Sequence, residues 1–325
     1  MAPEAGPGDE FAVIGRLRAL FEAAAGAGSA EGRSRPLGDI GIGDDAAVVT
    51  FPTSGPIVAA TDLVVAGVHV DLGLCALDDV GYKALMVSLS DLAAMGARPE
   101  YALVSIAAPP GTDLVLLGAG AAQAAAEVGC VVVGGDLSGS PVLTVCTAVF
   151  GSLAGAPGSG ALLRSGAEPG DRLFVTGALG GSAAGLRLLR EGGPTDPSSL
   201  GLAHRHRRPV ARIAEGEVAR ASGASAAIDI SDGLGADVRH LAEASGVGVA
   251  LDRVPVAGGA TTEEALDGGE DYELIIATRG PERLVAAFAA AGLRPLLAVG
   301  HCTDRTGEHT LAGRPLPLGG WRHTF

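Results

Sequence analysis

The chain alternates between strand-like and helix-like segments in two successive runs, and this alternation limits the folds that it can adopt. Short apolar segments of strand type are followed by longer segments of helical type, such as those predicted at 78–96 and 112–128. The two runs are separated by residues 154–171, which are rich in Gly, Ala, Ser and Pro and have the composition of a linker. The sequence therefore predicts an α/β (α+β) protein of two domains, residues 1–153 and 154–325.

The charge of the chain limits its partners. Its 325 residues include 37 Asp and Glu but only 23 Lys and Arg, which gives a net charge of −14. This excess of negative charge argues against binding to nucleic-acid backbones or to anionic membrane surfaces. Lys83 is the only lysine, and no Walker-type GxxxxGK[ST] loop or protein-kinase motif can be written onto the chain. If the protein handles phosphates, metal ions must supply much of the positive charge.

We expect a cytoplasmic protein. Gly, Pro or a charged residue interrupts every apolar stretch before the roughly 18 residues of a transmembrane helix. The N-terminal MAPEAGPGDE lacks the basic segment and apolar core of a signal peptide. Cys75, Cys130, Cys146 and Cys302 show no CxxC spacing, so we expect reduced, buried thiols rather than disulfides or zinc ligands.

Carboxylates recur where the predicted strands and helices begin or end. Asp44 and Asp45, for example, stand in GIGDDAAVV (41–49), before an apolar run that reads as a strand. A single such residue is most simply a helix cap, a turn former or a solvated charge. Several carboxylates that converge at one edge of a sheet repel one another unless hard cations lie between them. The set, predicted to hold Mg²⁺ with a nucleotide, comprises Asp44, Asp45, Asp62, Asp91, Asp136, Asp229 and Asp232.

Two glycine-rich stretches differ in what they predict. The glycines of GGD (134–136) would let backbone N–H groups approach phosphate oxygens closely. The stretch VTGALGGSAAG (175–185) follows a predicted strand, but its spacing is not the GxGxxG of a dinucleotide site. We interpret this second stretch as tight strand–helix packing with an anion at the start of the helix.

Several motifs, in this order and spread over nearly the whole chain, resemble the thiamine-monophosphate kinase family. They are IGDDAAVV, TDLVVAGVHVD, YKALMVSLSDLAAMGARP, GGD, RSGAEPGDRLFVTG, AIDISDGL and GGEDYEL. SLSDLAAMGA and GGEDYEL are the specific ones. The resemblance implies a fold like that of aminoimidazole-ribonucleotide synthetase, in which an N-terminal mixed sheet forms a β-barrel across a homodimer and a C-terminal α/β domain closes the ATP site. It also implies ATP-dependent phosphorylation of thiamine monophosphate to thiamine diphosphate.

The same resemblance implies roles for individual residues. Mg²⁺ ions along the ATP phosphates would be bound by Asp45, Ala60, Thr61, Asp62, Asp91, Asp136, Asp229 and Asp232, and of these Asp45, Asp62, Asp91 and Asp136 would be catalytic. The nucleotide would contact Gly135, Asp136, Arg164 and Ser231. Thiamine phosphate would be held by His69, Glu270 and Trp321. The aromatic face of Trp321 suits the thiazolium cation, although a lone tryptophan is as readily a core anchor.

The chain departs from the family pattern at two places. The usual STD is ATD here, so Ala60 offers a metal only its backbone carbonyl. The loop RHxxPxPR appears as HRHRRPVAR (204–212) and lacks the second proline, which leaves the conformation of that loop open.

Other members of the superfamily provide alternatives. Selenophosphate synthetase uses a reactive Cys or selenocysteine near its N-terminus, and the first cysteine here is Cys75. The hydrogenase-maturation relative carries its reactive Cys at the C-terminus, where this sequence reads GGWRHTF. An ATP-dependent ligase or cyclase like aminoimidazole-ribonucleotide synthetase stays open, as does a non-catalytic nucleotide-binding relative, although the intact acidic set argues against the latter.

Overall fold

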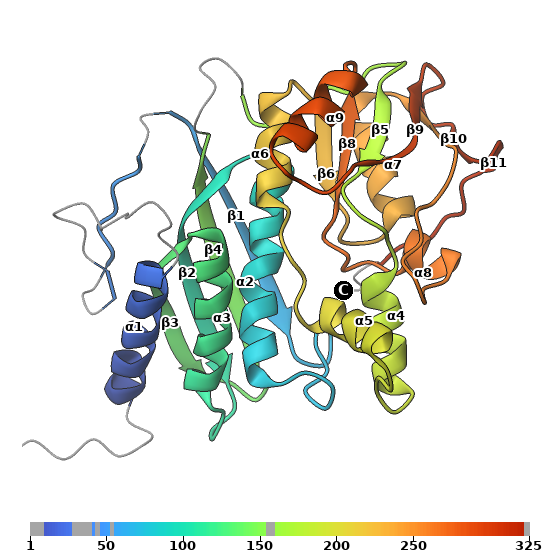
Figure 1. Ribbon diagram of the computed structural model, residues 1–325. Helices are drawn as coiled ribbons and strands as arrows, with labels where there is room; N and C mark the ends of the chain where they lie inside the picture. The colour runs from blue at the N-terminus through green and yellow to red at the C-terminus, as the bar shows by residue number, and fades with distance from the viewer. Residues whose placement is uncertain (1–9, 28–40, 43–45, 53–54, 154–159, 322–325) are drawn as a thin grey trace, which may run out of the picture. The chain divides into compact units, whose positions relative to one another are not determined.

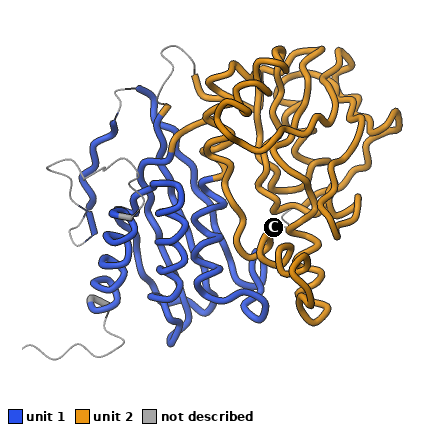
Figure 2. Tube along the Cα trace, in the orientation of Figure 1, with its two compact units in different colours: residues 1–89, 99–152 blue, residues 90–98, 153–325 orange. Residues whose placement is uncertain are grey.

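The computed structural model (Figure 1) describes residues 10–27, 41–42, 46–52, 55–153 and 160–321. The chain divides into two compact units, shown in Figure 2: Met1–Leu89 with Pro99–Ser152, and Ser90–Arg98 with Leu153–Phe325. Within the described ranges, no helix has both the length and the apolar character that crossing a membrane requires.

A mixed four-stranded sheet forms the centre of the first unit. Its elements are α1 (Glu10–Ala27), β1 (Ile57–Val65), α2 (Leu77–Ala94, whose last residues belong to the second unit), β2 (Arg98–Ala108), α3 (Leu114–Val128), β3 (Val131–Gly139) and β4 (Thr144–Ser152). The strand order is β1-β4-β2-β3, with β1 antiparallel to β4 and β2 parallel to β3. Figure 1 shows α1, α3 and α2 along one face of this sheet.

Glycines allow α2 and α3 to pack closely. A Cβ atom at Gly81 would lie 1.9 Å from the carbonyl oxygen of Leu117, and one at Gly120 would lie 1.8 Å from that of Asp78. The two helix backbones are therefore in direct contact, and no larger residue fits at either position. On the sheet, side chains of β1 alternate in exposure, and the outward-facing Ile57 and Leu63 are 46% and 55% exposed.

The second unit has a seven-stranded sheet in the order β11-β10-β7-β9-β5-β8-β6. Its strands are β5 (Arg172–Val175), β6 (Ala226–Asp229), β7 (Gly248–Leu251), β8 (Leu274–Thr278), β9 (Leu297–Thr303), β10 (His309–Leu311) and β11 (Arg314–Pro315). Its helices are α4 (Gly181–Arg190), α5 (Pro197–Arg207), α6 (Ile213–Ala221), α7 (Leu234–Ser245), α8 (Thr262–Asp267) and α9 (Pro281–Ala290). All neighbouring strands are antiparallel except β7 and β10.

Both faces of this second sheet are covered, and each has its own apolar core. Along β5, Leu173 and Val175 belong to the core that also contains Leu241 of α7. Phe174, between them, belongs to a second core with Phe288 of α9. Because successive strand residues point to opposite faces, a continuous apolar run such as LFV (173–175) is what a doubly covered sheet requires.

The predicted fold class and the reduced state of the cysteines are confirmed. All four cysteines are free, and three of them, Cys75, Cys130 and Cys302, are buried, whereas Cys146 is half-buried. Burial raises the pKa of the Cys130 and Cys302 thiols to about 12, so they stay protonated and unreactive at neutral pH.

Three local predictions were wrong. The apolar run 46–49 is not a strand; only Val48 makes an isolated bridge, and the segment is held instead by the Tyr101 hydroxyl, which donates to the carbonyl of Thr50 at 2.6 Å. GGD lies inside β3 rather than after it, because pairing with β2 continues to Gly139. The polar, proline-containing stretch before a helix predicted around 208–221 reads as a loop in the sequence, but it contains α5; the predicted helix itself is α6, which begins at Ile213.

Candidate active site

Asp62 projects from β1 toward the helix-covered face of the first sheet. It is paired with Thr147 of β4, and directly opposite residues of an antiparallel pair share a face. The Thr147 hydroxyl donates to the carbonyl of Ala84 in α2 at 2.9 Å, which identifies that face. Asp62 Oδ2 is buried and has no hydrogen-bond partner among the described residues. A buried carboxylate oxygen without a donor is unfavourable unless a cation compensates it, so Asp62 fits the role of a hard-metal ligand.

The neighbouring predicted ligands on β1 differ from Asp62. Thr61 points to the opposite face, and its hydroxyl donates to the carbonyl of Thr147 at 2.9 Å. Ala60 shares the face of Asp62 by alternation, but it carries only a methyl group. Of the three, Asp62 alone presents a ligating side chain on the helix-covered face. Asp44 and Asp45 lie outside the described residues.

His69 occupies the turn that follows β1. Its Nδ1 accepts a hydrogen bond from the backbone N–H of Val65 at 3.0 Å, so in the neutral ring the proton is on Nε2. The half-buried imidazole is thereby fixed as a donor, which is the property needed to bind a phosphate oxygen.

Gly135 and Asp136 lie within β3, where Asp136 is exposed. A Cβ atom at Gly135 would lie 1.8 Å from the carbonyl oxygen of Val104, so glycine is required here by the pairing of β3 with β2. The signal in GGD is therefore at least partly structural, and the exposed Asp136 is available to a ligand.

In the second unit, two predicted carboxylates, Asp229 and Asp232, lie at the end of β6. Asp229 is the last residue of β6 and accepts a hydrogen bond from the Ser90 hydroxyl at 2.7 Å. Asp91 follows Ser90 directly along the chain, so the backbone of Asp91 lies beside the Asp229 carboxylate. Asp232 follows three residues after Asp229, in the turn that leads into α7. The structure thus places Asp229 and Asp232 close to one another and the backbone of Asp91 close to Asp229.

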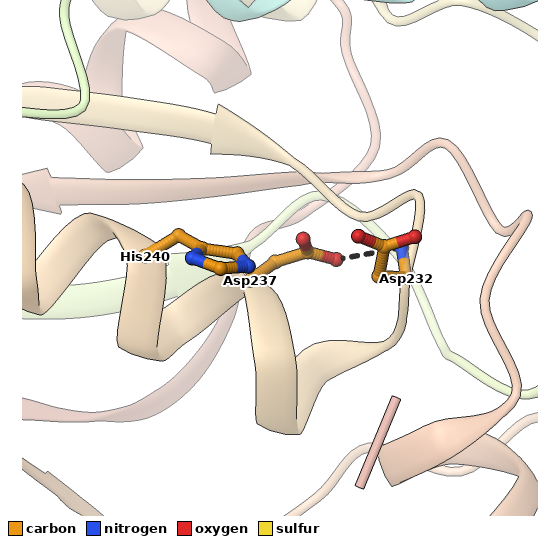
Figure 3. A group of neighbouring side chains, drawn as sticks. All are labelled: Asp232, Asp237 and His240. Atoms are coloured by element: carbon orange, nitrogen blue, oxygen red, sulfur yellow. Dashed lines mark hydrogen bonds between the residues drawn. The ribbon is translucent and has the colours of Figure 1, made fainter. Parts of the chain in front are cut away.

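Asp237, a fourth carboxylate, was not predicted. Figure 3 shows it on the first turns of α7, with its carboxylate pointing to the Asp232 turn. Asp237 Oδ2 accepts from the backbone N–H groups of Asp232 and Gly233 at 3.0 and 3.1 Å. Burial, together with repulsion from Asp229 and Asp232, raises the pKa of Asp237 to about 8. Asp237 is therefore largely protonated at neutral pH, and its role in the described structure is to hold the turn in place.

One ligand atom from each of Asp232, Asp237 and His240 lies within 4.8 Å of those from the other two (Figure 3). The cluster offers mainly carboxylate oxygens, which are the donors that Mg²⁺ prefers. This chemistry fits the metal that the family resemblance implies. Within the second unit, the predicted residues that would hold it are Asp91, Asp229 and Asp232.

The segment GGEDYEL forms a constrained loop before β8. Glu270 and Tyr272 have positive φ angles of 60° and 49°, which non-glycine residues rarely adopt. Their backbone N–H groups donate to the carbonyls of Ser231 and Ile230 at 2.7 and 2.9 Å. These two hydrogen bonds hold the loop beside the Ser231 turn, and such strained, over-determined backbone is typical of functional sites.

A buried histidine, itself in contact with a buried serine, holds Glu270 from a different direction. Nδ1 of His206, in α5, lies 3.3 Å from Glu270 Oε2 and 3.1 Å from the hydroxyl of Ser182 in α4. His206 is 3% exposed and Ser182 is 1% exposed. The Glu270 carboxylate is therefore presented in one defined orientation, as a substrate-binding group requires.

The anion predicted at the start of α4 is present, and it belongs to the protein itself. The Asp271 carboxylate accepts from the backbone N–H groups of Gly180 and Ser182. Burial raises the pKa of Asp271 to about 6, although these two hydrogen bonds oppose the shift. The glycine-rich stretch thus serves to dock the GGEDYEL loop onto α4 and is not a dinucleotide site.

Trp321 lies near the Asp232 turn, whereas Arg164 does not. The backbone N–H of Trp321 donates to the carbonyl of Asp232 at 3.1 Å, and its side chain is 52% exposed. The carbonyl of Arg164 accepts from the hydroxyl of Ser245, the last residue of α7. Because α7 has 12 residues, its two ends are roughly 18 Å apart. Arg164 is therefore separated from Ser231, and a shared nucleotide would have to span the helix.

Comparison with known proteins identifies the family of both halves of the chain. Residues 43–153 match the model of the AIR synthase related protein, N-terminal domain, and residues 168–311 match that of the C-terminal domain. The thiamine-monophosphate kinase of Bacillus subtilis (strain 168) is 35% identical over 286 residues, which cover 82% of this chain and 86% of the relative. The chain belongs to the thiamine-monophosphate kinase family.

Solved structures agree with this assignment. The crystal structure of thiamine-monophosphate kinase from Stenotrophomonas maltophilia K279a superposes with a TM-score of 0.80 at 32% identity, covering 94% of this chain and 97% of that one. AaThiL complexed with AMPPCP and TMP gives a TM-score of 0.74 at 32% identity, covering 82% of this chain and 87% of that one. The predicted family and the two-domain fold are confirmed.

Within this thiamine-monophosphate kinase family member, sequence reading missed three supporting residues. Asp271 lies in GGEDYEL and His206 in HRHRRPVAR, but neither was given a role from the sequence, and Asp237 lies just after AIDISDGL, outside the quoted motifs. The one available signal was the position of Asp237 in the first turns of a helix that follows a carboxylate-rich turn, where an acidic side chain can accept from free backbone N–H groups.

Proposed function

We infer that this protein transfers the γ-phosphoryl group of ATP to the phosphate of thiamine monophosphate, giving thiamine diphosphate and ADP. The observation that carries the proposal is its likeness, over most of both chains, to AaThiL complexed with AMPPCP and TMP. The carboxylate cluster at the Asp232 turn and the constrained GGEDYEL loop supply the two kinds of group that such a reaction needs. One group offsets phosphate charge, and the other orients the acceptor.

The residues divide by role. Asp62 and Asp136 in the first unit, and Asp91, Asp229 and Asp232 in the second, hold Mg²⁺, with Asp45 as a further ligand. When bound, Mg²⁺ supplies the positive charge that relieves repulsion between the two reacting phosphates. Gly135 and Ser231 contact the nucleotide, and Arg164 reaches it only if the nucleotide spans the length of α7. Thiamine monophosphate is bound by His69 through its Nε2–H, by the Glu270 carboxylate, and by the aromatic face of Trp321.

The assay that tests this function measures thiamine diphosphate formed from ATP, Mg²⁺ and thiamine monophosphate by the purified protein. We expect product formation and ADP release in equal amounts, both dependent on thiamine monophosphate. ATP turnover that does not depend on it would favour the ligase or cyclase alternative. The absence of any turnover would favour a non-catalytic nucleotide-binding relative.

We expect direct transfer without a phosphorylated enzyme. The acceptor is a phosphate monoester with a second pKa of about 6, so near pH 7 it is mostly a dianion and needs no general base. The proposed site accordingly contains carboxylates and glycines and no Ser–His or Cys–His nucleophile pair among its assigned residues. Transfer from ATP made chiral at the γ-phosphorus should therefore proceed with inversion. Net retention, or a trapped phosphorylated side chain on the kinetic path, would contradict it.

We also propose that the protein is a homodimer built through its first unit. β1 is an edge strand of the four-stranded sheet, and Ile57 and Leu63 are exposed on its outward face. Pairing such an edge with a second copy removes unpaired backbone groups and covers apolar side chains. Analytical ultracentrifugation at micromolar concentration should give the mass of a dimer. A compact monomer at that concentration would exclude this arrangement.

A further inference from the structure

The C-terminal segment 316–321 lies along α7 and is tied down at both ends. At its start, Leu316 is 5% exposed, and its backbone N–H donates to the carbonyl of His309 at 2.9 Å. At its end, the backbone N–H of Trp321 donates to the carbonyl of Asp232 at 3.1 Å. The segment therefore connects the apolar core of the second unit to the carboxylate-rich turn.

The middle of this segment has no anchoring side chain of its own. Leu318 is 85% exposed, and it is followed by Gly319 and by Gly320, whose φ angle is +102°. A Cβ atom at Gly319 would lie 2.0 Å from Asp267 Oδ1 and one at Gly320 would lie 2.5 Å from the Cβ of Ala236, so glycine lets the backbone pass close to α8 and α7. Because this close fit adds no side-chain contact, we expect the placement of the half-exposed Trp321 to depend also on how firmly the start of the segment is anchored.

Arg239, on α7, supplies that anchor. Its Nη2 donates to the carbonyl oxygens of Leu316 and Pro317 at 2.7 and 2.6 Å. Its Nη1 donates to the carbonyl of Gly235, one helical turn earlier, at 2.8 Å. The third hydrogen bond fixes the guanidinium against its own helix, so the planar group presents its other donors in a defined direction. Hydrogen bonds from a charged donor are stronger than neutral ones.

We propose that Arg239 is a positioning residue for substrate binding: by clamping the start of the C-terminal segment to α7, it sets the place at which Trp321 is presented beside the Asp232 turn. The inference rests on the proposed function in that Trp321 is taken to contact thiamine monophosphate. Arg239 itself touches no substrate. Arg239 orders the segment before the substrate binds. Less of the binding free energy contributed by Trp321 is then lost to ordering the segment.

The test exploits the fact that Trp321 is the only tryptophan of the chain. In Arg239→Ala, we expect the fluorescence anisotropy of Trp321 to fall and its quenching by acrylamide to rise. We expect the KM for thiamine monophosphate to rise roughly tenfold. The value of kcat should stay within about twofold and the KM for ATP should not change, because only ground-state binding of one substrate is weakened.

Two further variants complete the design. Arg239→Lys keeps the charge without the planar fork, so it should give intermediate values and, because it is the milder change, should remain folded if the alanine variant does not. Arg305→Ala is the matched control, because Arg305 makes an exposed ion pair with Glu308 at 3.0 Å and should alter none of these values. Circular dichroism and thermal midpoints verify folding.

The outcomes separate the inference from the proposed function. Unchanged anisotropy and quenching in both Arg239 variants would overturn the clamp. Changed fluorescence with an unchanged KM for thiamine monophosphate would overturn its role in substrate binding. If Trp321→Ala leaves that KM unchanged, the proposed contact of Trp321 with substrate fails, while a fall in anisotropy in Arg239→Ala still supports the clamp.

Discussion

Asp62→Asn is expected to lower the rate of thiamine monophosphate phosphorylation by at least about a hundredfold. Asn has nearly the shape of Asp, but its amide is neutral and has a single oxygen, so it is a poor ligand for a hard cation. Asp62 Oδ2 is buried and accepts no hydrogen bond within the described part of the chain, so the negative charge at this position is available for a cation. Steady-state assays over a range of Mg²⁺ concentrations measure the effect.

The same substitution should not destabilise the fold. Replacing a buried, incompletely solvated charge with a neutral amide removes a desolvation cost, so the free energy of unfolding should be unchanged or higher without Mg²⁺. Asp113→Asn is the matched control: Asp113 caps α3 by accepting from two backbone N–H groups, and Asn caps helices equally well. Near-normal turnover in Asp62→Asn, or a large loss of stability, would contradict the metal-ligand assignment.

The parts of the fold that were predicted depend on local signals. The Ala-rich helix predicted at 112–128 is α3, which begins after the cap at Asp113 and ends at Gly129 in the left-handed conformation. The strand AAIDI and the carboxylate turn after it are as expected, because a strand end, a turn and a helix start follow each other within a few residues. Such features are determined by neighbours in sequence.

The parts that were missed depend on distant residues. α5 has a capping box at Asp196 and proline at its first position. Its buried face includes His206, however, so the helical spacing of apolar residues that would predict a helix is weak. That histidine is buried because it contacts Glu270 and Ser182, which are far from it in the sequence. β3 continues through two glycines because β2 lies beside it. The placement of Arg164 away from Ser231 likewise follows from packing against α7 and from no local pattern.

Glu273→Gln is expected to destabilise the second unit by about 3–5 kcal/mol, because it removes one partner of a buried ion-pair network. Glu273 is 0% exposed. Its carboxylate receives two hydrogen bonds from Arg212 at 2.8 and 2.7 Å and one from Thr176 at 2.6 Å. Arg294 approaches it to 3.2 Å. With Gln in its place, Arg212 would keep its charge, at 16% side-chain exposure, without a carboxylate to balance it.

The pH dependence provides a second measure of the same network. Burial alone would raise the pKa of Glu273, but Arg212 and Arg294 outweigh it and hold this pKa below the ordinary value of 4.5. A depressed carboxyl pKa contributes stability above the unfolded value that is lost as pH falls through the folded value. The difference between wild type and Glu273→Gln should therefore be full at pH 7 and should shrink below about pH 4.5.

Urea unfolding followed by the fluorescence of Trp321, which lies in the second unit, reports on this network directly. The control is Glu217→Gln, because Glu217 pairs with Arg98 in the same unit at 3.1 Å, with side-chain exposures of 28% and 41%. Such a half-exposed pair contributes only about 0–1 kcal/mol. Two results would show that the second unit does not depend on the charge of Glu273. One is a urea midpoint of Glu273→Gln equal to that of Glu217→Gln. The other is a stability difference between wild type and Glu273→Gln that does not vary between pH 7 and pH 4. The expected result would instead show that the last acidic residue of GGEDYEL, Glu273, stabilises the loop that carries Glu270.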